Sequence, residues 1–111
     1  MPVNSRAKGV RGELAVRDMI RAMGFEAQRS QQYNGNAGGA DVTTSIDGLH
    51  VEVKNTNRLS PYQFMLQAQR DAKGAIPSVW MHSDNEPWLI VIKADDLLQF
   101  VDVIQRARVQ P

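Results

Sequence analysis

The chain has 111 residues, of which 42% are hydrophobic and 23% charged, with no cysteine and a formal net charge of +1. This composition is typical of one globular domain spanning residues 1–111, and it excludes a disordered chain, disulfides and thiolate metal sites. Because no apolar run approaches the roughly 20 residues of a membrane span and the start has no signal-peptide core, we expect a cytoplasmic protein with no membrane partner.

The first third of the chain predicts a helix, a strand and a loop. Residues 5–23 read as an amphipathic helix, capped by Asn4 or Ser5 and ended by Gly24. Its apolar positions recur at helical spacing: Leu14, Ala15, Met19, Ile20 and Met23. A short strand over 25–30 follows, and the asparagines and glycines of 33–39 predict a loop.

Residues 41–54 predict a β-hairpin with one polar and one apolar face. Asp47-Gly48 favours a two-residue type I′ turn, which pairs Asp41 with Lys54 and leaves Glu52 diagonal to Asp41. Because alternate residues share a side, the polar face carries Asp41, Thr43, Ser45, His50, Glu52 and Lys54. The apolar face accounts for packing in a core.

The remaining sequence predicts a second helix, two strands and a third helix. Ser60-Pro61-x-Gln63 combines an N-cap, a proline at the first helical position and a capping-box glutamine, and it opens a helix over 61–73 that Gly74 ends. Strands over 76–82 and 88–93 flank a turn, and Asp95 and Asp96 favour the start of a C-terminal helix. The predicted order is α-β-β-β-α-β-β-α.

The polar face of the hairpin has two interpretations. Surface strands often carry Asp, Glu and Lys, so an isolated E-x-K is more often ordinary surface charge. However, two neighbouring carboxylates repel each other unless a cation lies between them, and Mg²⁺ prefers such oxygen ligands. The glycines before Asp41 allow a ligand to approach closely, which favours a metal site at Asp41 and Glu52 with Lys54 beside it.

The chain resembles the PD-(D/E)XK nuclease superfamily, and within it the archaeal-type Holliday junction resolvases. The matching segments, in order, are Lys8-Gly9 with Glu13, Gly24-Phe25, Arg29-Ser30, Ala40-Asp41-Val42, Val51-Glu52-Val53-Lys54 and Gly74-Ala75-Ile76-Pro77. The resemblance implies an α/β fold in which helices flank a mixed central sheet of about five strands.

The resemblance also implies an activity and its residues. The catalytic residues would be Glu13, Asp41, Glu52 and Lys54. Mg²⁺, or Mn²⁺ as a substitute, would be bound by Asp41, Glu52, the Val53 carbonyl and Glu13, the last directly or through water. Such enzymes act as homodimers that nick opposed strands of a four-way DNA junction. Two other functions are compatible with the sequence: a related nuclease with another DNA target, such as a nickase or a restriction- or repair-type enzyme, and an inactive DNA-structure binder. For the location, the resemblance is compatible with a nucleoid-associated or a virus-encoded intracellular protein.

Other residues have weaker assignments. The candidate contacts to DNA are Lys8, Arg11, Arg29, Ser30 and Arg58, although ordinary surface charge explains any one of the basic residues nearly as well. Gly9 and Gly12 indicate either a late helix start or close approach of the DNA backbone. We expect Gln63 and Gln67 to be exposed helix residues rather than site contacts, His50 to be partly exposed, and Trp80 and Trp88 to pack in a core or an interface.

Overall fold

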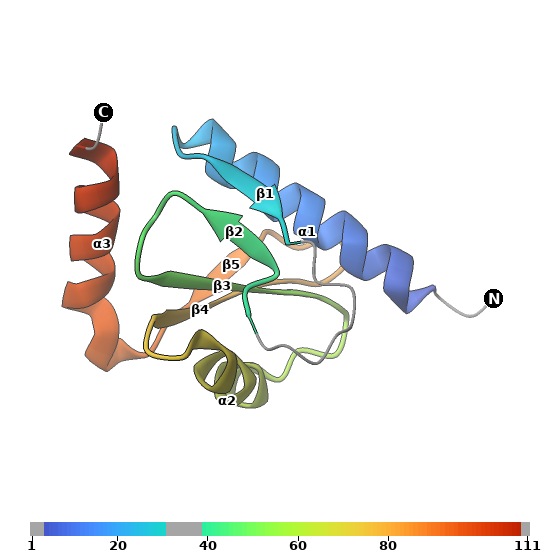
Figure 1. Cartoon of the computed structure of the whole chain (residues 1–111). Coiled ribbons are helices and arrows are strands. Elements are labelled where there is room, and N and C mark those ends of the chain that lie inside the picture. Colours follow the sequence, from blue (N-terminus) through green and yellow to red (C-terminus); the bar gives the residue numbers. More distant parts are fainter. Residues whose placement is uncertain (1–3, 31–38, 110–111) are drawn as a thin grey trace.

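The computed structural model describes residues 4–30 and 39–109, and in them five strands form one mixed sheet with helices on both faces (Figure 1). In chain order the elements are α1 (Ser5–Ala22), β1 (Ala27–Arg29), β2 (Val42–Thr44), β3 (Leu49–Asn55), α2 (Pro61–Ala72), β4 (Ile76–His82), β5 (Leu89–Val91), the 3₁₀ turn η1 (Ala94–Asp96) and α3 (Leu97–Val109). This architecture confirms the predicted fold class. The predicted loop over 33–39 lies outside the described residues, apart from Gly39.

The sheet is built around a long parallel pair. Its strand order is β1-β2-β3-β4-β5. β3 and β4 run parallel from Leu49 opposite Ile76 to Asn55 opposite His82, whereas the other neighbouring strands are antiparallel. A parallel pair needs a crossover connection, and α2 supplies it. β3 is therefore central, with partners on both edges.

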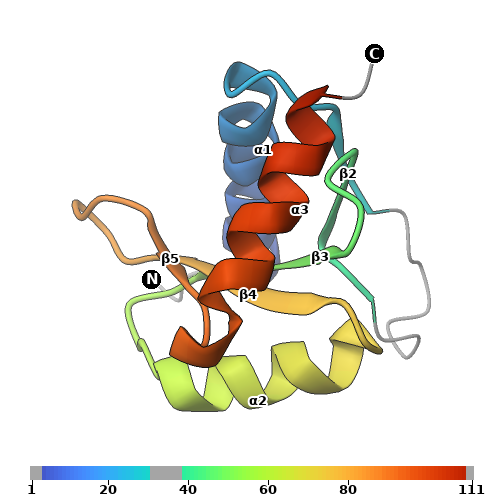
Figure 2. The ribbon, with the colours of Figure 1, turned by 90° about the vertical axis from the view of Figure 1, so that its left-hand side faces the viewer.

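Helices cover β3 on both faces, and its His50 and Glu52 side chains are buried. α1 packs on one face through Val16 and Ile20, in a core that includes Val51 and Trp80. α2 lies on the other face (Figures 1 and 2). There Met65 and Ala68 pack with Val79 and Met81. Glu52 pairs with Val79 in the parallel ladder and so lies on the α2 face. The polar face of the hairpin is thus interior at His50 and Glu52, whereas Thr43 is exposed.

The buried stripe of α1 differs from the predicted one. It runs through Gly12, Val16 and Ile20, whereas the predicted Met23 is 58% exposed. Gly12 lies inside the helix against β3, where an added Cβ would stand 2.7 Å from the Asn55 Cβ. The late helix start is therefore wrong. The close approach at Gly12 is to the protein's own strand rather than to DNA.

The hairpin keeps its predicted faces and the position of its turn, but not the predicted turn type or register. Val42 pairs with Val51, which puts Asp41 opposite Glu52 instead of Lys54. The Leu49 N–H donates to the Ile46 carbonyl at 3.2 Å, so Asp47-Gly48 does form the turn. Gly48 has a φ of +88°, but Asp47 is outside the left-handed region that a type I′ turn requires. The backbone N–H of Ser45 donates to the Glu26 carbonyl near β1 at 3.0 Å, so Ser45 leaves the ladder between β2 and β3. A two-residue shift preserves which side each residue faces.

The remaining helices show two further differences. Ser60 makes no side-chain capping bond, so the predicted capping box is wrong, although Pro61 does open α2. On α3, Val103 is the buried residue, whereas Leu98 is 80% exposed. In the described residues no helix is long and apolar enough to cross a membrane.

Candidate active site

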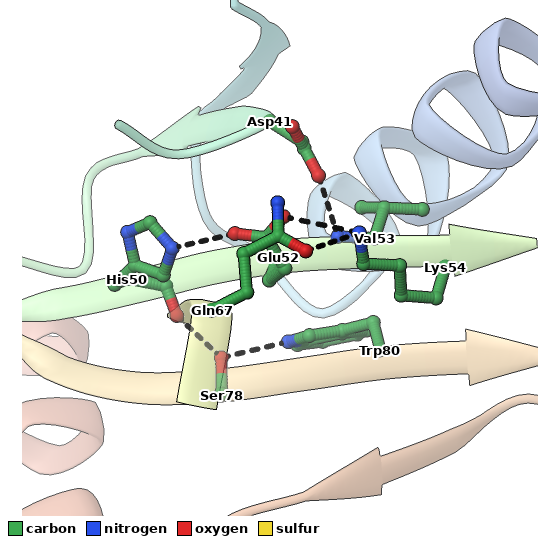
Figure 3. A network of polar contacts seen from close by, with 8 residues as sticks. All are labelled: Asp41, His50, Glu52, Val53, Lys54, Gln67, Ser78 and Trp80. Carbon is green, nitrogen blue, oxygen red and sulfur yellow. Dashed lines mark hydrogen bonds and ion pairs between the residues drawn. The ribbon is translucent and has the colours of Figure 1, made fainter. Parts of the chain in front are cut away.

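Asp41 is fixed by its backbone between two strands. It directly precedes β2, where its N–H donates to the Val51 carbonyl at 3.0 Å and its carbonyl accepts from the Ser30 N–H at 2.9 Å. Its side chain turns toward β3, and Oδ2 accepts a hydrogen bond from the Val53 N–H at 2.8 Å (Figure 3). These three bonds hold the carboxylate beside Glu52.

Glu52 is a buried acid in the middle of β3, with 3% of its surface exposed. Its Oε1 lies 2.9 Å from the Nε2 of His50, and its Oε2 lies 3.7 Å from the Nζ of Lys54 (Figure 3). A buried carboxylate is costly unless charged or hydrogen-bonding groups surround it. Here the strand itself supplies both partners, because residues two apart share a side.

Lys54 is held in place by the crossover helix. Its Nζ donates to the Oε1 of Gln67 at 2.8 Å and lies 5.5 Å from the centre of the Phe64 ring. Gln67 therefore belongs to the site, contrary to our expectation for it, whereas Gln63 is exposed as expected. The sequence signal for Gln67 was its place one helical turn after Gln63, but that spacing alone does not show what the helix faces.

Burial and neighbouring negative charge both oppose the ionisation of Asp41. The pKa of Asp41 is raised from 3.8 to about 7, first by burial and then by the charge of Glu52, with a smaller effect from Glu13. The Val53 N–H and the Lys54 charge act in the opposite direction but do not balance these effects. A site that resists ionisation of its second carboxylate gains most from an additional cation.

Glu13 lies near this centre but has a different partner. Its Oε1 accepts from the Nε of Arg29 at 2.6 Å, in an ion pair between α1 and β1. Among the described residues, no three side chains of His, Asp or Glu come together closely enough to hold a metal ion. The structure thus brings Asp41, Glu52 and Lys54 together and leaves Glu13 beside them.

The donor set fits a hard divalent cation. Asp41 and Glu52 offer carboxylate oxygens, and each has one oxygen already fixed by a hydrogen bond. The N–H and C=O of a strand residue point to the same edge, so the Val53 carbonyl faces the side on which Asp41 lies. Mg²⁺ is commonly held by one or two carboxylates, with water and substrate phosphate completing six ligands.

The candidate DNA contacts fall into two groups. Arg11 and Arg58 are exposed. Lys8, in contrast, pairs with Asp84 at 2.9 Å, and its side chain is only 12% exposed. Arg29 is engaged by Glu13, and the backbone of Ser30 anchors Asp41, as described above. The side chains most open to a phosphate are therefore those of Arg11 and Arg58.

Comparison with solved structures identifies a similar fold. The chain is similar to Hjc of Archaeoglobus fulgidus, a Holliday junction resolvase from an archaeal hyperthermophile, with a TM-score of 0.57. The two chains share a fold. The similarity covers 77% of this chain and 72% of that one at 22% sequence identity. No family model and no curated protein sequence matches the chain.

Proposed function

We propose that the protein is a metal-dependent endodeoxyribonuclease that resolves four-way DNA junctions, with Mg²⁺ as its cofactor and Mn²⁺ as a substitute. The observation that carries this proposal is the half-buried Asp41 beside the buried Glu52, with Lys54 at their edge, in a fold similar to that of a resolvase. A protein that only bound DNA would have no need to crowd two carboxylates where a phosphate must approach.

The residues of the site have separate roles in phosphodiester hydrolysis. Asp41, Glu52 and the Val53 carbonyl would hold the cation, which supplies charge neutralisation at the phosphate and an acidic water. The Nζ of Lys54, held by Gln67, would orient the attacking water and stabilise charge that develops on the phosphate. The water oxygen bonds to phosphorus as the bond to the 3′ oxygen breaks, leaving a 5′-phosphate and a 3′-hydroxyl. Glu13 would act through a water.

A homodimer is part of this proposal because paired nicks need two active sites. Exposed apolar side chains on α2, β5 and α3 support it: Tyr62, Leu66, Leu89, Ile90, Leu97, Leu98 and Val101. Between α2 and the segment after β5 runs an apolar groove of about 490 Å³, lined in part by Tyr62, Leu66 and Val91. Apolar patches of this kind commonly mark protein interfaces. We assign this surface to a second copy of the chain.

The direct test is cleavage of a mobile four-way junction in Mg²⁺, compared with linear duplex, flap and single-stranded DNA. We expect paired nicks in the junction, and loss of cleavage by at least a hundredfold in Asp41→Ala and Glu52→Gln with junction binding retained. Asp47→Asn, an exposed acid on the same hairpin, is the matched control. Full activity in either site variant would contradict the mechanism.

The same assay separates the alternatives. Equal cleavage of linear duplex would indicate a nuclease with another DNA target. Junction binding without cleavage in either Mg²⁺ or Mn²⁺ would indicate a DNA-structure binder that keeps the fold but lacks the activity.

A further inference from the structure

His50 is a buried histidine for which the proposed reaction has no role. It lies on β3 two residues before Glu52, on the same face, and 4% of it is exposed. This contradicts our expectation of a partly exposed strand histidine. A buried imidazole without a hydrogen-bond partner is costly. Its Nε2 finds that partner in the Oε1 of Glu52, at 2.9 Å (Figure 3).

The bond from His50 determines which oxygen of Glu52 remains for a cation. A terminal carboxylate torsion is broad, so without a partner the group could present either oxygen or both. With Oε1 occupied by the His50 ring, Oε2 is the oxygen nearest Lys54. On Asp41 the corresponding restraint is the Val53 N–H, which occupies Oδ2. Each carboxylate therefore has one oxygen fixed by the protein and a second left for a ligand.

We propose that His50 is a positioning residue that fixes Glu52 by donating from Nε2 to Oε1, so that Oε2 faces the cation site. This inference rests on the proposed function, since it requires that Glu52 hold a metal. An ionised carboxylate only accepts hydrogen bonds, so Nε2 carries the proton in this pair. Partners that orient metal ligands in this way contribute typically 10- to 100-fold to metal affinity or activity.

Two other roles for His50 make different predictions. As a metal ligand through Nε2, it would need a free lone pair on that atom and would have to leave Glu52. As a purely structural residue, it would contribute to stability without affecting metal binding. The neighbouring Ser78 provides a control for the structural role. Its hydroxyl donates to the His50 carbonyl at 2.7 Å and accepts from the Trp80 indole at 3.0 Å, without touching Glu52.

Two substitutions of nearly equal chemistry separate these roles. In His50→Gln the amide nitrogen stands three bonds beyond Cβ, as Nε2 does in histidine, and can still donate to Oε1. In His50→Asn it stands only two bonds beyond Cβ and falls short. We expect His50→Gln to bind Mn²⁺ within about threefold of the wild type and His50→Asn to bind about 10- to 100-fold more weakly. Ser78→Ala should lose stability but keep the Mn²⁺ affinity.

The measurement is calorimetric titration of the DNA-free protein with Mn²⁺, after melting curves in EDTA have shown that each variant folds. If His50→Asn does not fold, His50→Leu, which fills the site with apolar volume, replaces it as the variant without a donor. In a second measurement, raising Mn²⁺ should restore junction cleavage by His50→Asn, because the defect is in affinity.

Each outcome has a defined meaning. Unchanged Mn²⁺ affinity in the variant without a donor overturns the positioning role. Equal loss in His50→Gln and His50→Asn also overturns it, because the imidazole itself would then be required. If the wild type binds no Mn²⁺, the proposed function fails and the inference fails with it. If the wild type binds Mn²⁺ and cleaves junctions while His50→Gln and His50→Asn have the same Mn²⁺ affinity as each other, only the inference fails.

Discussion

Replacing Asp41 with asparagine should stabilise the metal-free protein at alkaline pH. The substitution keeps the shape of the side chain and an oxygen that can accept from the Val53 N–H, but it removes the charge that burial and Glu52 oppose. The pKa of Asp41 is raised from 3.8 to about 7 on folding. Between these values the folded state binds more protons than the unfolded state, so the stability contribution of Asp41 falls as pH rises through this window and is flat above it.

The size of the effect follows from the pKa shift. From pH 5 to pH 8 the wild type should lose about 2 to 3 kcal/mol of unfolding free energy relative to Asp41→Asn, because one pKa unit corresponds to about 1.4 kcal/mol. The assay is urea denaturation at both pH values in EDTA, repeated at pH 8 with Mn²⁺. Mn²⁺ should stabilise the wild type and leave the variant nearly unchanged, since binding to the folded state alone adds stability.

Two results would refute this reasoning. Parallel pH dependence of the wild type and Asp41→Asn in EDTA would show that Asp41 ionises normally in the folded state. A wild type that is more stable than the variant at pH 8 without metal would show that the carboxylate is already compensated, and the site would then have no need of a cation.

Three further predictions concern packing, assembly and DNA binding. Gly12→Ala should destabilise the fold by about 1 to 3 kcal/mol because its Cβ would collide with Asn55. In contrast, Gly9→Ala should stabilise the fold by about 0.5 to 1 kcal/mol, because Gly9 has open space around it. Equal melting temperatures of the two variants would contradict both predictions. Leu66→Lys on the exposed face of α2 should turn a dimer into a monomer in sedimentation velocity, and a variant that remains dimeric would exclude this surface. Arg58→Ala should lower the slope of log affinity against log salt for junction binding by about 1 without changing Mn²⁺ affinity, and an unchanged slope would remove Arg58 from the contacts.

The fold was predictable because its strongest signals are local. β4 spans Ile76–His82, as predicted, since a short, mainly apolar segment between a helix-ending glycine and a turn has few alternatives. The two faces of the hairpin also follow from the alternation of side chains, and this placed Asp41 and Glu52 on one side without any knowledge of the register. An error of two residues in pairing left that result intact.

The features that the sequence did not predict depend on contacts between distant segments. The register of β2 was wrong although Asp47-Gly48 does form a turn, because the Ser45 N–H bonds to Glu26, 19 residues earlier, and Ser45 therefore leaves the hairpin ladder. The burial of His50 was missed because the crossover helix covers that face of β3, and hairpin alternation alone cannot show it. Gln67 joined the site for the same reason. In each case, contacts between segments that are distant in the sequence decided the structure.

The contacts of α2 with Lys54 have a thermodynamic consequence. A free lysine side chain carries about 2 kcal/mol of rotamer entropy, which it must lose when it takes up one working position. In this protein Gln67 and the Phe64 ring restrict Lys54 in the folded chain. Lys54 therefore loses part of its rotamer entropy once, when the chain folds, instead of each time that a phosphate binds. Helix α2 therefore connects β3 to β4 and also preorganises a side chain that a flexible lysine would have to order anew with every turnover.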